Sequence, residues 1–196
     1  AGTYTVTITD SNGWTETNSS SVTGTSSLAL SLSSANYNGY EVSCFGDSTG
    51  EITTSASGGI SPYTYLWNNS DTTQNLSNLS AGSYSVTMTD GAGCPLTESI
   101  LLTEPTQLSS SFSSTDISCF GGDNGSIDIT PFGGINPYDF DWDNGAITED
   151  LTTISAGQYI VTITDVNNCV FNNTITLTEP NLLYSSSTQT NVSCYG

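Results

Sequence analysis

Apolar residues alternate with Thr or Ser along much of the chain. Tyr4, Val6 and Ile8 alternate with threonines, and a closely similar phrase returns at residues 84–89 and 159–164. A period of two with a hydroxyl-rich outer face predicts half-buried antiparallel strands. No stretch shows a convincing helical period, and Gly-Gly, Asn-Gly and Pro interrupt the strands at short intervals. The pattern therefore predicts an all-β chain of small antiparallel β-sandwiches.

The cysteines mark a tandem repeat. Cys119 follows Cys44 by 75 residues, Cys194 follows Cys119 by 75, and Cys169 follows Cys94 by 75. Even spacing of this kind is typical of repeat proteins, in which each repeat is one structural unit. Because it starts and ends within a repeat, we expect a window on a longer secreted protein. We expect part of a preceding repeat at 1–25, complete repeats at 26–105 and 106–180, and the first strand of a following repeat at 181–196.

Each complete repeat is expected to contain about seven strands, which is small for a sandwich. Glu104-Pro105 and Glu179-Pro180 close the two complete repeats, and Pro there stops strand pairing from running on. In the first repeat, alternation and turn signals place strands at about 28–43, 51–57, 63–67, 72–79, 83–89 and 96–103.

Four aromatic residues are expected in the cores. Trp67 and Trp142 stand where such sandwiches bury an aromatic side chain. Tyr84 and Tyr159 follow an Ala-Gly corner that resembles the corner before the sixth strand of immunoglobulin-like domains, where a Tyr hydroxyl bonds to upstream backbone. A ligand-stacking platform is the alternative interpretation of the aromatics. The expected fold is a tandem of immunoglobulin-like antiparallel β-sandwiches of about 75 residues each.

Composition narrows the function further. The chain has 196 residues, 19 acidic residues and no Lys, Arg or His, so its net charge is −19. Imidazole-based catalysis and Lys Schiff bases are excluded, and nucleic acid should be repelled because binding it needs basic residues. No apolar run approaches the ~20 residues of a membrane span. Paired carboxylates could serve a glycosidase, but nothing in the sequence indicates a cleft. We therefore expect no enzymatic activity.

The cysteines are expected to form disulfides in an oxidising, extracellular setting. We expect bridges within each repeat, Cys44–Cys94 and Cys119–Cys169, with Cys194 bound to a residue outside the sequence. Such a bridge would close a loop of about 50 residues and stabilise a small core by about 4 kcal/mol in the chain-entropy model.

Two alternatives to this pairing remain. Free buried thiols are one. Bridges across the junctions are the other, Cys94–Cys119 and Cys169–Cys194, which would leave Cys44 alone. Trp14 favours pairing within a repeat, because it occupies the place of the second cysteine in the partial first repeat.

Carboxylates provide weak candidates for a metal site. Asp139, Asp141 and Asp143 alternate on one predicted strand face, roughly 7 Å apart, and could gather calcium. A solvated acidic face is the simpler interpretation, so we expect no cofactor, with calcium as the alternative. Three further aspartates recur at the last hairpin turn of each repeat, where an Asp that caps its own turn explains them without metal: Asp10, Asp90 and Asp165.

Two short motifs suggest surface modification. Ser48 and Thr72 lie in Asp-Ser/Thr-Thr triplets that fit the short O-glycosylation pattern of Bacteroidota. Glycans would suit an exposed, Thr-rich surface.

Taken together, the repeated residues resemble the SprB repeat, named for the giant surface adhesin of gliding Bacteroidota. The resemblance covers nearly the whole chain. Trp14 and the stretch between Asp10 and Cys44 depart from it, because that stretch spans 34 residues (44 − 10) against 29 (119 − 90) in the next repeat. The residues that carry it, with counterparts 75 positions later, are Ser43-Cys44-Phe45-Gly46, Gly50, Gly58-Gly59, Pro62-Tyr63, Trp67, Leu76, Leu79, Ala81-Gly82, Tyr84, Asp90, Cys94 and Glu104-Pro105.

The resemblance implies a very long immunoglobulin-like array, exported by the type IX secretion system to the outer cell surface, where it serves adhesion and gliding. We expect a structural segment of such an adhesin or filament, whose partners are neighbouring repeats, surface glycans or other cells. The alternatives are an array of glycan- or ligand-binding modules and a homopolymeric extracellular fibre or sheath. No catalytic constellation recurs with the repeat.

Overall fold

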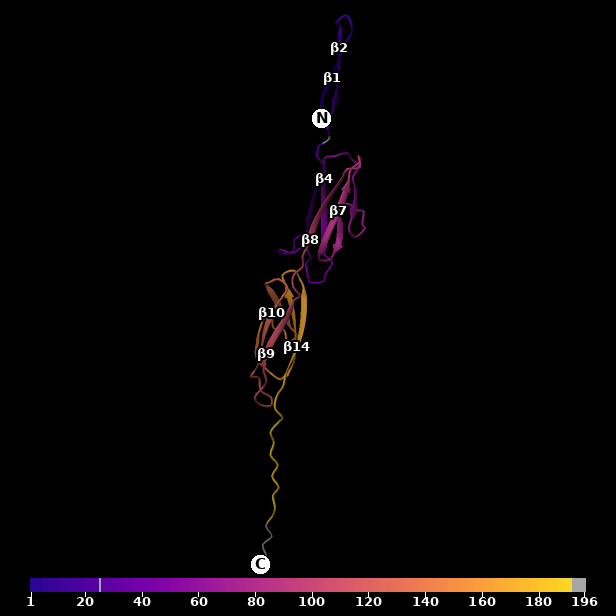
Figure 1. The fold of residues 1–196 in the computed structure, drawn as a ribbon. Coiled ribbons are helices and arrows are strands. Elements are labelled where there is room, and N and C mark those ends of the chain that lie inside the picture. The colour runs from indigo at the N-terminus through magenta and orange to yellow at the C-terminus, as the bar shows by residue number, and fades with distance from the viewer. Residues whose placement is uncertain (25, 192–196) are drawn as a thin grey trace, which may run out of the picture. The chain divides into compact units, whose positions relative to one another are not determined.

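The fold is all-β, as expected from the alternation. A computed structural model describes residues 1–24 and 26–191, which contain fourteen β-strands and no helix (Figure 1). Every strand pair is antiparallel. The strands form one two-stranded and four three-stranded sheets.

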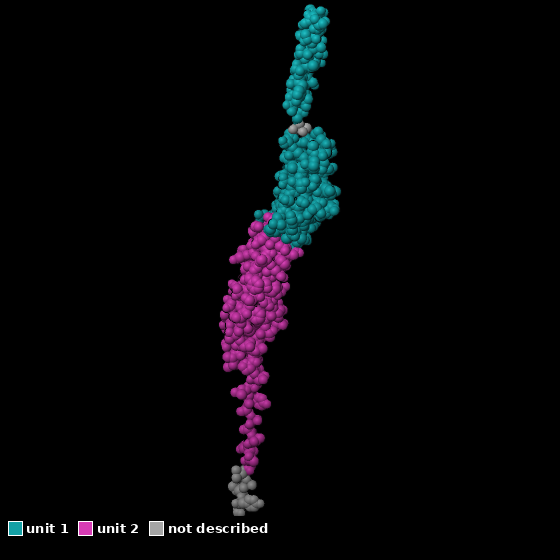
Figure 2. Space-filling view, in the orientation of Figure 1, with its two compact units in different colours: residues 1–36, 47–103 teal, residues 37–46, 104–196 magenta. Residues whose placement is uncertain are grey.

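The chain divides into two compact units that do not follow the sequence strictly. Unit 1 comprises residues 1–36 and 47–103, and unit 2 comprises residues 37–46 and 104–196 (Figure 2). The segment 37–46 therefore belongs to unit 2, although it lies in sequence between two strands of unit 1.

Unit 1 contains two three-stranded sheets. One has the order β3-β4-β6 and the other β5-β7-β8. Their strands are β3 (Ala29–Ser34), β4 (Gly50–Ser57), β5 (Thr64–Trp67), β6 (Leu76–Leu79), β7 (Gly82–Thr89) and β8 (Pro95–Leu102). Alternate residues of β4 and β7 point inward, so that Ile52, Val86 and Met88 are fully buried. The period of two thus places one face of each sheet in the core.

Unit 2 repeats this plan with sheets β9-β10-β12 and β11-β13-β14. Their strands are β9 (Ser109–Thr115), β10 (Gly125–Phe132), β11 (Tyr138–Trp142), β12 (Leu151–Ile154), β13 (Gly157–Asp165) and β14 (Val170–Leu177). Ile127, Trp142, Val161 and Ile163 are among the residues of its buried core. Each complete repeat has six strands in its two three-stranded sheets, where we expected about seven.

The first 24 residues include a hairpin, β1 (Gly2–Thr9) paired with β2 (Thr15–Val22). Tyr4, Val6 and Ile8 are exposed there, whereas the corresponding Val86 and Met88 of β7 are fully buried. At the other end, residues 181–191 adopt no strand, and the remainder of the strand expected at 181–196 lies outside the described residues.

The aromatic residues expected in the cores have defined partners. Trp67 and Trp142 are each 2% exposed. Their indole N–H groups donate to the Thr73 and Thr148 carbonyls at 2.8 and 2.9 Å. A ligand cannot stack on indoles this deeply buried.

The two tyrosines form the expected corner bonds. Tyr84 Oη donates to the Ser80 carbonyl at 3.0 Å, and Tyr159 Oη donates to the Ser155 carbonyl at 2.9 Å. Both rings are half-buried. The Ala-Gly corner therefore fixes the entry into β7 and β13 as it does in immunoglobulin-like domains.

The strand expected at 28–43 is wrong in its length, because β3 ends at Ser34. Beyond it, Tyr37 and Tyr40 form an isolated antiparallel bridge across Asn38 and Gly39, whose φ angles are 53° and 102°. Positive φ at both central residues defines the tight turn that Asn-Gly favours. β9 begins 80 residues after β3 (109 − 29), while Cys119 follows Cys44 by 75 (119 − 44), so the first repeat has five extra residues here.

Candidate functional site

A carboxylate holds the hairpin turn between β13 and β14. Asp165 Oδ1 accepts hydrogen bonds from the backbone N–H groups of Asn167 and Cys169, at 2.8 and 2.9 Å. Asp165 Oδ2 accepts from Ile135 N at 2.9 Å. The side chain is 3% exposed, and its negative charge is compensated by three N–H donors. These bonds fix the direction in which Cys169 leaves the turn.

The turn between β7 and β8 has the same construction. Asp90 Oδ1 accepts from Ala92 N and Cys94 N at 3.0 and 2.8 Å, and Oδ2 accepts from Ile60 N at 2.9 Å. The Cys94 N–H lowers the pKa of Asp90 below its ordinary value, the Ile60 and Ala92 N–H groups add to this, and desolvation opposes it. Asp10 likewise accepts from Asn12 N and Trp14 N. The recurring aspartates thus have turn N–H groups as partners.

The Gly-Gly pair of each repeat makes room for this carboxylate. A Cβ on Gly59 would lie 2.7 Å from Asp90 Oδ2, and one on Gly134 would lie 2.8 Å from Asp165 Oδ2. Both glycines also have positive φ, at 61° and 57°. Glycine is therefore required on steric and on conformational grounds.

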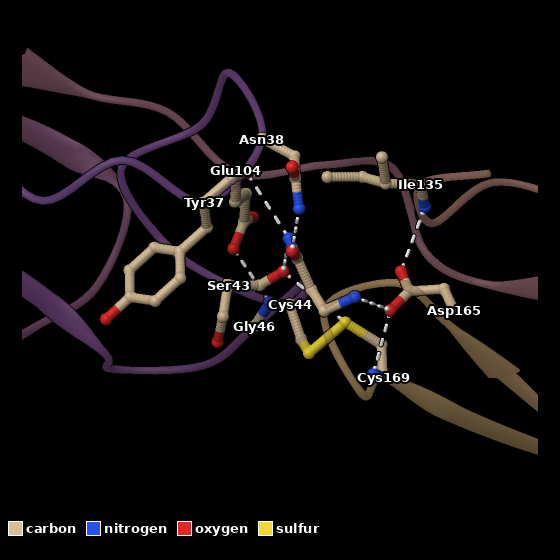
Figure 3. The surroundings of a disulfide bond; sticks show 10 residues. Tyr37, Asn38, Ser43, Cys44, Gly46, Glu104, Ile135, Asp165 and Cys169 are labelled. Atoms are coloured by element: carbon tan, nitrogen blue, oxygen red, sulfur yellow. Dashed lines mark hydrogen bonds between the residues drawn. A yellow bond between two sulfur atoms is a disulfide. The ribbon is translucent and has the colours of Figure 1, made fainter. Parts of the chain in front are cut away.

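The segment 37–46 is bonded covalently to the hairpin turn of unit 2. Cys44 and Cys169 form a disulfide with an S–S distance of 2.05 Å and a Cα–Cα distance of 5.6 Å (Figure 3). Cys169 is 8% exposed and belongs to the core of unit 2, and Cys44 packs against that core. The two cysteines are separated by 125 residues, so this is a long-range link.

Asparagine side chains form hydrogen bonds beside the disulfide, to backbone carbonyls and to one another. Asn167 Nδ2 donates to the carbonyls of Tyr37 and Ser43 at 3.3 and 3.1 Å. Asn38 Nδ2, from the tight turn, donates to Asn167 Oδ1 at 2.6 Å. Asn167 therefore uses both ends of its amide to hold the segment.

A glutamate holds the other side of the cysteine loop. Glu104 Oε2 accepts from Gly46 N at 2.7 Å, within unit 2 (Figure 3). The second repeat has the same bond, in which Glu179 Oε2 accepts from Gly121 N at 2.6 Å. The Glu of each Glu-Pro pair thus anchors a Cys-Phe-Gly turn 58 residues earlier in the chain.

The expected pairings Cys44–Cys94 and Cys119–Cys169 are wrong, because Cys44 is bonded to Cys169 while Cys94 and Cys119 are free and exposed. The alternative of bridges across the junctions is wrong for Cys94–Cys119, and Cys194 lies outside the described residues. The prediction assumed that the loop with Cys44 folds onto its own repeat. In the structure this loop belongs to unit 2, where Asn167 binds the carbonyls of Tyr37 and Ser43 and Cys169 is the near cysteine.

The calcium candidates do not converge. Asp139 and Asp141 are exposed on β11, and Asp143 Oδ1 accepts from Ile160 N at 3.1 Å. Within residues 1–24 and 26–191, no three Asp, Glu, Cys or His side chains are placed to hold a metal ion. Ser48 and Thr72, the candidates for glycosylation, are exposed, and Ser48 Oγ lies 2.8 Å from Ser80 Oγ.

Reasoning from the sequence missed the roles of three polar residues that hold the segment 37–46. Asn38 was signalled by its Asn-Gly dipeptide inside the stretch that is five residues too long. Glu104 was signalled by its fixed distance of 58 residues from the glycine of the Cys-Phe-Gly turn. Asn167 had no signal, because the equivalent residue of the first repeat is Ala92.

Comparison with protein families finds matches in two segments of the chain. The family model described as "SprB repeat" matches residues 40–72 and 111–147. The chain carries two SprB repeat matches. They confirm the resemblance expected from the sequence, and the equivalent of residue 40 one repeat later, residue 115, lies inside the second SprB segment. Both SprB matches include a cysteine loop, a Gly-Gly pair and a core tryptophan.

Solved structures of cell-adhesion proteins show a distant likeness. The Down Syndrome Cell Adhesion Molecule with eight N-terminal Ig domains is 14% identical at a TM-score of 0.44, covering 92% of this chain and 28% of that one. Dscam1 isoform 6.44, with its four N-terminal Ig domains, is 12% identical at a TM-score of 0.34. The match covers 86% of this chain and 52% of that one. Murine CEACAM1b is 13% identical at a TM-score of 0.29, and the match covers 68% of this chain and 94% of that one. At these TM-scores the likeness does not define a shared topology.

No curated protein matches the chain. Within the described residues, no helix is long and apolar enough to cross a membrane.

Proposed function

We propose that the chain is a structural repeat segment of a very long secreted adhesin or filament on the outer cell surface. The observation that carries this proposal is the SprB repeat match at corresponding positions of two successive repeats. In more detail, we propose that this adhesin serves surface attachment and gliding in Bacteroidota, after export by the type IX secretion system. Neighbouring repeats of the same chain are the first partners.

The construction of the repeats supports a mechanical role. A disulfide that links residues 125 apart limits how far the chain extends when pulled, because the covalent loop stays closed after the sheets separate. The net charge of −19 keeps neighbouring filaments apart at low salt. The features that recur in both units, the Asp cap, the Gly-Gly pair, the buried Trp and the Tyr corner, all serve the fold.

Labelling of intact cells tests the proposal. Antibodies raised against the 196-residue chain should label unpermeabilised cells that produce the protein, and deletion of the repeats should reduce attachment to a surface. Labelling that requires permeabilisation would contradict the surface location. Unchanged attachment after deletion of the repeats, with the rest of the protein still displayed, would contradict the adhesive role.

One observation favours a second function, an array of glycan- or ligand-binding modules. Phe45 and Phe120 occupy equivalent positions beside the loop cysteines, and they are 52% and 54% exposed. Exposed aromatic rings are common anchors in binding surfaces. Binding of the chain to a glycan array that is lost in Phe45→Ala/Phe120→Ala, but not in Phe132→Ala, would favour this function over a stalk. Calcium in either role stays a prediction, to be checked by calorimetric titration.

A further inference from the structure

Within residues 1–24 and 26–191, the chain contains one occupied copy of a covalent joint and two free halves of it. The loop half of the joint is a Ser-Cys-Phe-Gly turn, here residues 43–46, and the hairpin half is an Asp-capped turn that ends in Cys, here residues 165–169. Cys44 and Cys169 join these halves. The second repeat has a loop half at residues 118–121, and the first repeat has a hairpin half at residues 90–94.

Both free halves are built as they are in the joint. In the loop half, Gly121 N donates to Glu179 at 2.6 Å, as Gly46 N donates to Glu104 at 2.7 Å. In the hairpin half, Asp90 Oδ1 accepts from Cys94 N at 2.8 Å, as Asp165 Oδ1 accepts from Cys169 N at 2.9 Å. Backbone geometry that directs the cysteine is therefore present before a partner arrives.

The exposure of the cysteines distinguishes the occupied joint from its halves. Cys169 is 8% exposed, whereas Cys94 and Cys119 are exposed thiols. In the occupied joint a loop cysteine is bonded to a hairpin cysteine. Each free half therefore has the other kind of half as its complement.

We propose that Cys119 and Cys94 each form a disulfide with the complementary half of another repeat of this type, Cys119 with a hairpin cysteine and Cys94 with a loop cysteine. The separation of 125 residues between Cys44 and Cys169 equals one repeat of 75 plus the 50 residues between Cys44 and Cys94. Each loop thus pairs with the hairpin of the following repeat, so that successive repeats are linked by overlapping covalent loops.

The bond forms by thiol–disulfide exchange. One thiolate attacks a small-molecule disulfide, such as oxidised glutathione, to give a mixed disulfide and one small-molecule thiol. The second cysteine thiolate then displaces the other small-molecule thiol and completes the protein disulfide. Two protein thiols are oxidised, and one small-molecule disulfide is reduced to two thiols.

Residue differences make the free halves depend more on this bond. Ala92 stands where Asn167 holds the segment of the occupied joint, and the loop before Cys119 lacks the turn that contains Asn38. The hairpin at residues 10–14 is a natural exception. Asp10 caps it, but Trp14 replaces the cysteine, so it cannot form the bond.

Disulfide mapping of a lengthened chain tests the proposal. One additional copy of residues 106–180 is inserted after Pro180, which places its hairpin cysteine 125 residues after Cys119. A Val170→Ile change in the added copy alone tags its hairpin peptide by mass. A Cys119→Ser change in the added copy removes its loop cysteine, so that peptide 117–123 comes from the original repeat alone. The protein is equilibrated with reduced and oxidised glutathione, alkylated, and cut after Asp and Glu, since it has no Lys or Arg for trypsin.

We expect peptide 117–123 to be linked to the tagged hairpin peptide, with the loss of two hydrogen atoms from the mass of the joined pair. Cys119→Ser in the original repeat of the same lengthened chain should return the added hairpin cysteine to an alkylated thiol. Peptide 42–47 linked to the untagged hairpin peptide shows that the occupied joint has formed in the same sample.

The unlengthened chain, treated identically, distinguishes the source of the partner. Covalent oligomers linked through Cys119 and Cys94 would show that a second copy of the chain also supplies the complementary half. Monomers in that arm, with the expected link in the lengthened chain, assign the partner to the same chain. A Cys119 that is alkylated in the lengthened chain, or linked within one chain to Cys94 or to the untagged hairpin, would overturn the proposal. The readout is the pairing of thiols, so it is independent of surface display.

Discussion

The hairpin turns of the two units differ although the strands around them are alike. In both, an aspartate accepts the same three backbone N–H groups and a cysteine follows four residues later. In unit 2 the turn holds the segment 37–46 through Asn167 and Cys169, whereas in unit 1 Ala92 and a free Cys94 occupy those positions. The comparison teaches that the fold of a repeat does not depend on its tie to another segment.

Removing the disulfide should have the largest effect, and it should be measurable in unit 2, which contains both cysteines. The chain-entropy model gives about 5 kcal/mol for a loop of 125 residues. Cys44→Ser/Cys169→Ser should therefore lower the urea midpoint of unit 2, whose β13 and β14 amides would exchange hydrogen faster. The matched control is Cys94→Ser/Cys119→Ser, which removes two thiols and should leave the midpoint unchanged. An equal loss in both double variants would break the comparison.

Truncation of the core tryptophans should show that the two units depend on equivalent cores. Trp67 and Trp142 are equally buried and make the same indole hydrogen bond. Trp67→Ala and Trp142→Ala should each cost about 3–5 kcal/mol in their own unit. Urea unfolding followed by hydrogen exchange measures both. A much smaller loss of stability for one variant than for the other would show that the two cores are not equivalent.

Asn167 should matter less than the disulfide but should affect its stability to reduction. Asn167→Ala removes two hydrogen bonds to backbone carbonyls, which together contribute roughly 1–2 kcal/mol. The Cys44–Cys169 bond should then be reduced faster by dithiothreitol, and unit 2 should melt at a lower temperature. Ala92→Asn is the reciprocal control. It adds the amide to a hairpin with a free cysteine and should change neither quantity.

The smallest effect should be present at neutral pH and lost in acid. Asp90 has a lowered pKa in the folded chain, mainly because the Cys94 N–H donates to it. Its ionised form is therefore stabilised by folding, and that stability is present above the unfolded-state pKa and lost as the pH falls through the folded-state pKa. Asp90→Asn should be less stable than the parent at neutral pH, and the difference should shrink as the pH falls below the ordinary Asp pKa of about 3.9.

Asp139→Asn makes the same change of charge at an exposed position of β11 and serves as the control. Thermal melts across pH measure both variants. A gap between parent and Asp90→Asn that stays constant into strong acid would contradict the role given to the N–H donors.

Much of the fold could be predicted because local patterns determine it. The alternation in residues 84–89 follows directly from a sheet with one buried face, and the corner tyrosines are marked by a short local motif. The pairing of cysteines could not be predicted this way. It depends on which unit the segment 37–46 joins, and its side-chain contacts there come from Asn167, which lies far away in the sequence. Even spacing of Cys44, Cys94, Cys119 and Cys169 is compatible with several pairings.

A peptide map of the oxidised 196-residue chain tests the central claim most directly. Cleavage after Asp and Glu puts the four described cysteines in separate peptides, namely 42–47, 91–98, 117–123 and 166–179. We predict that 42–47 is linked to 166–179, and that 91–98 and 117–123 carry alkylated thiols when the map is made before any further oxidation. Peptide 42–47 linked to 91–98 would contradict the account, because each loop would then be tied to the hairpin of its own repeat.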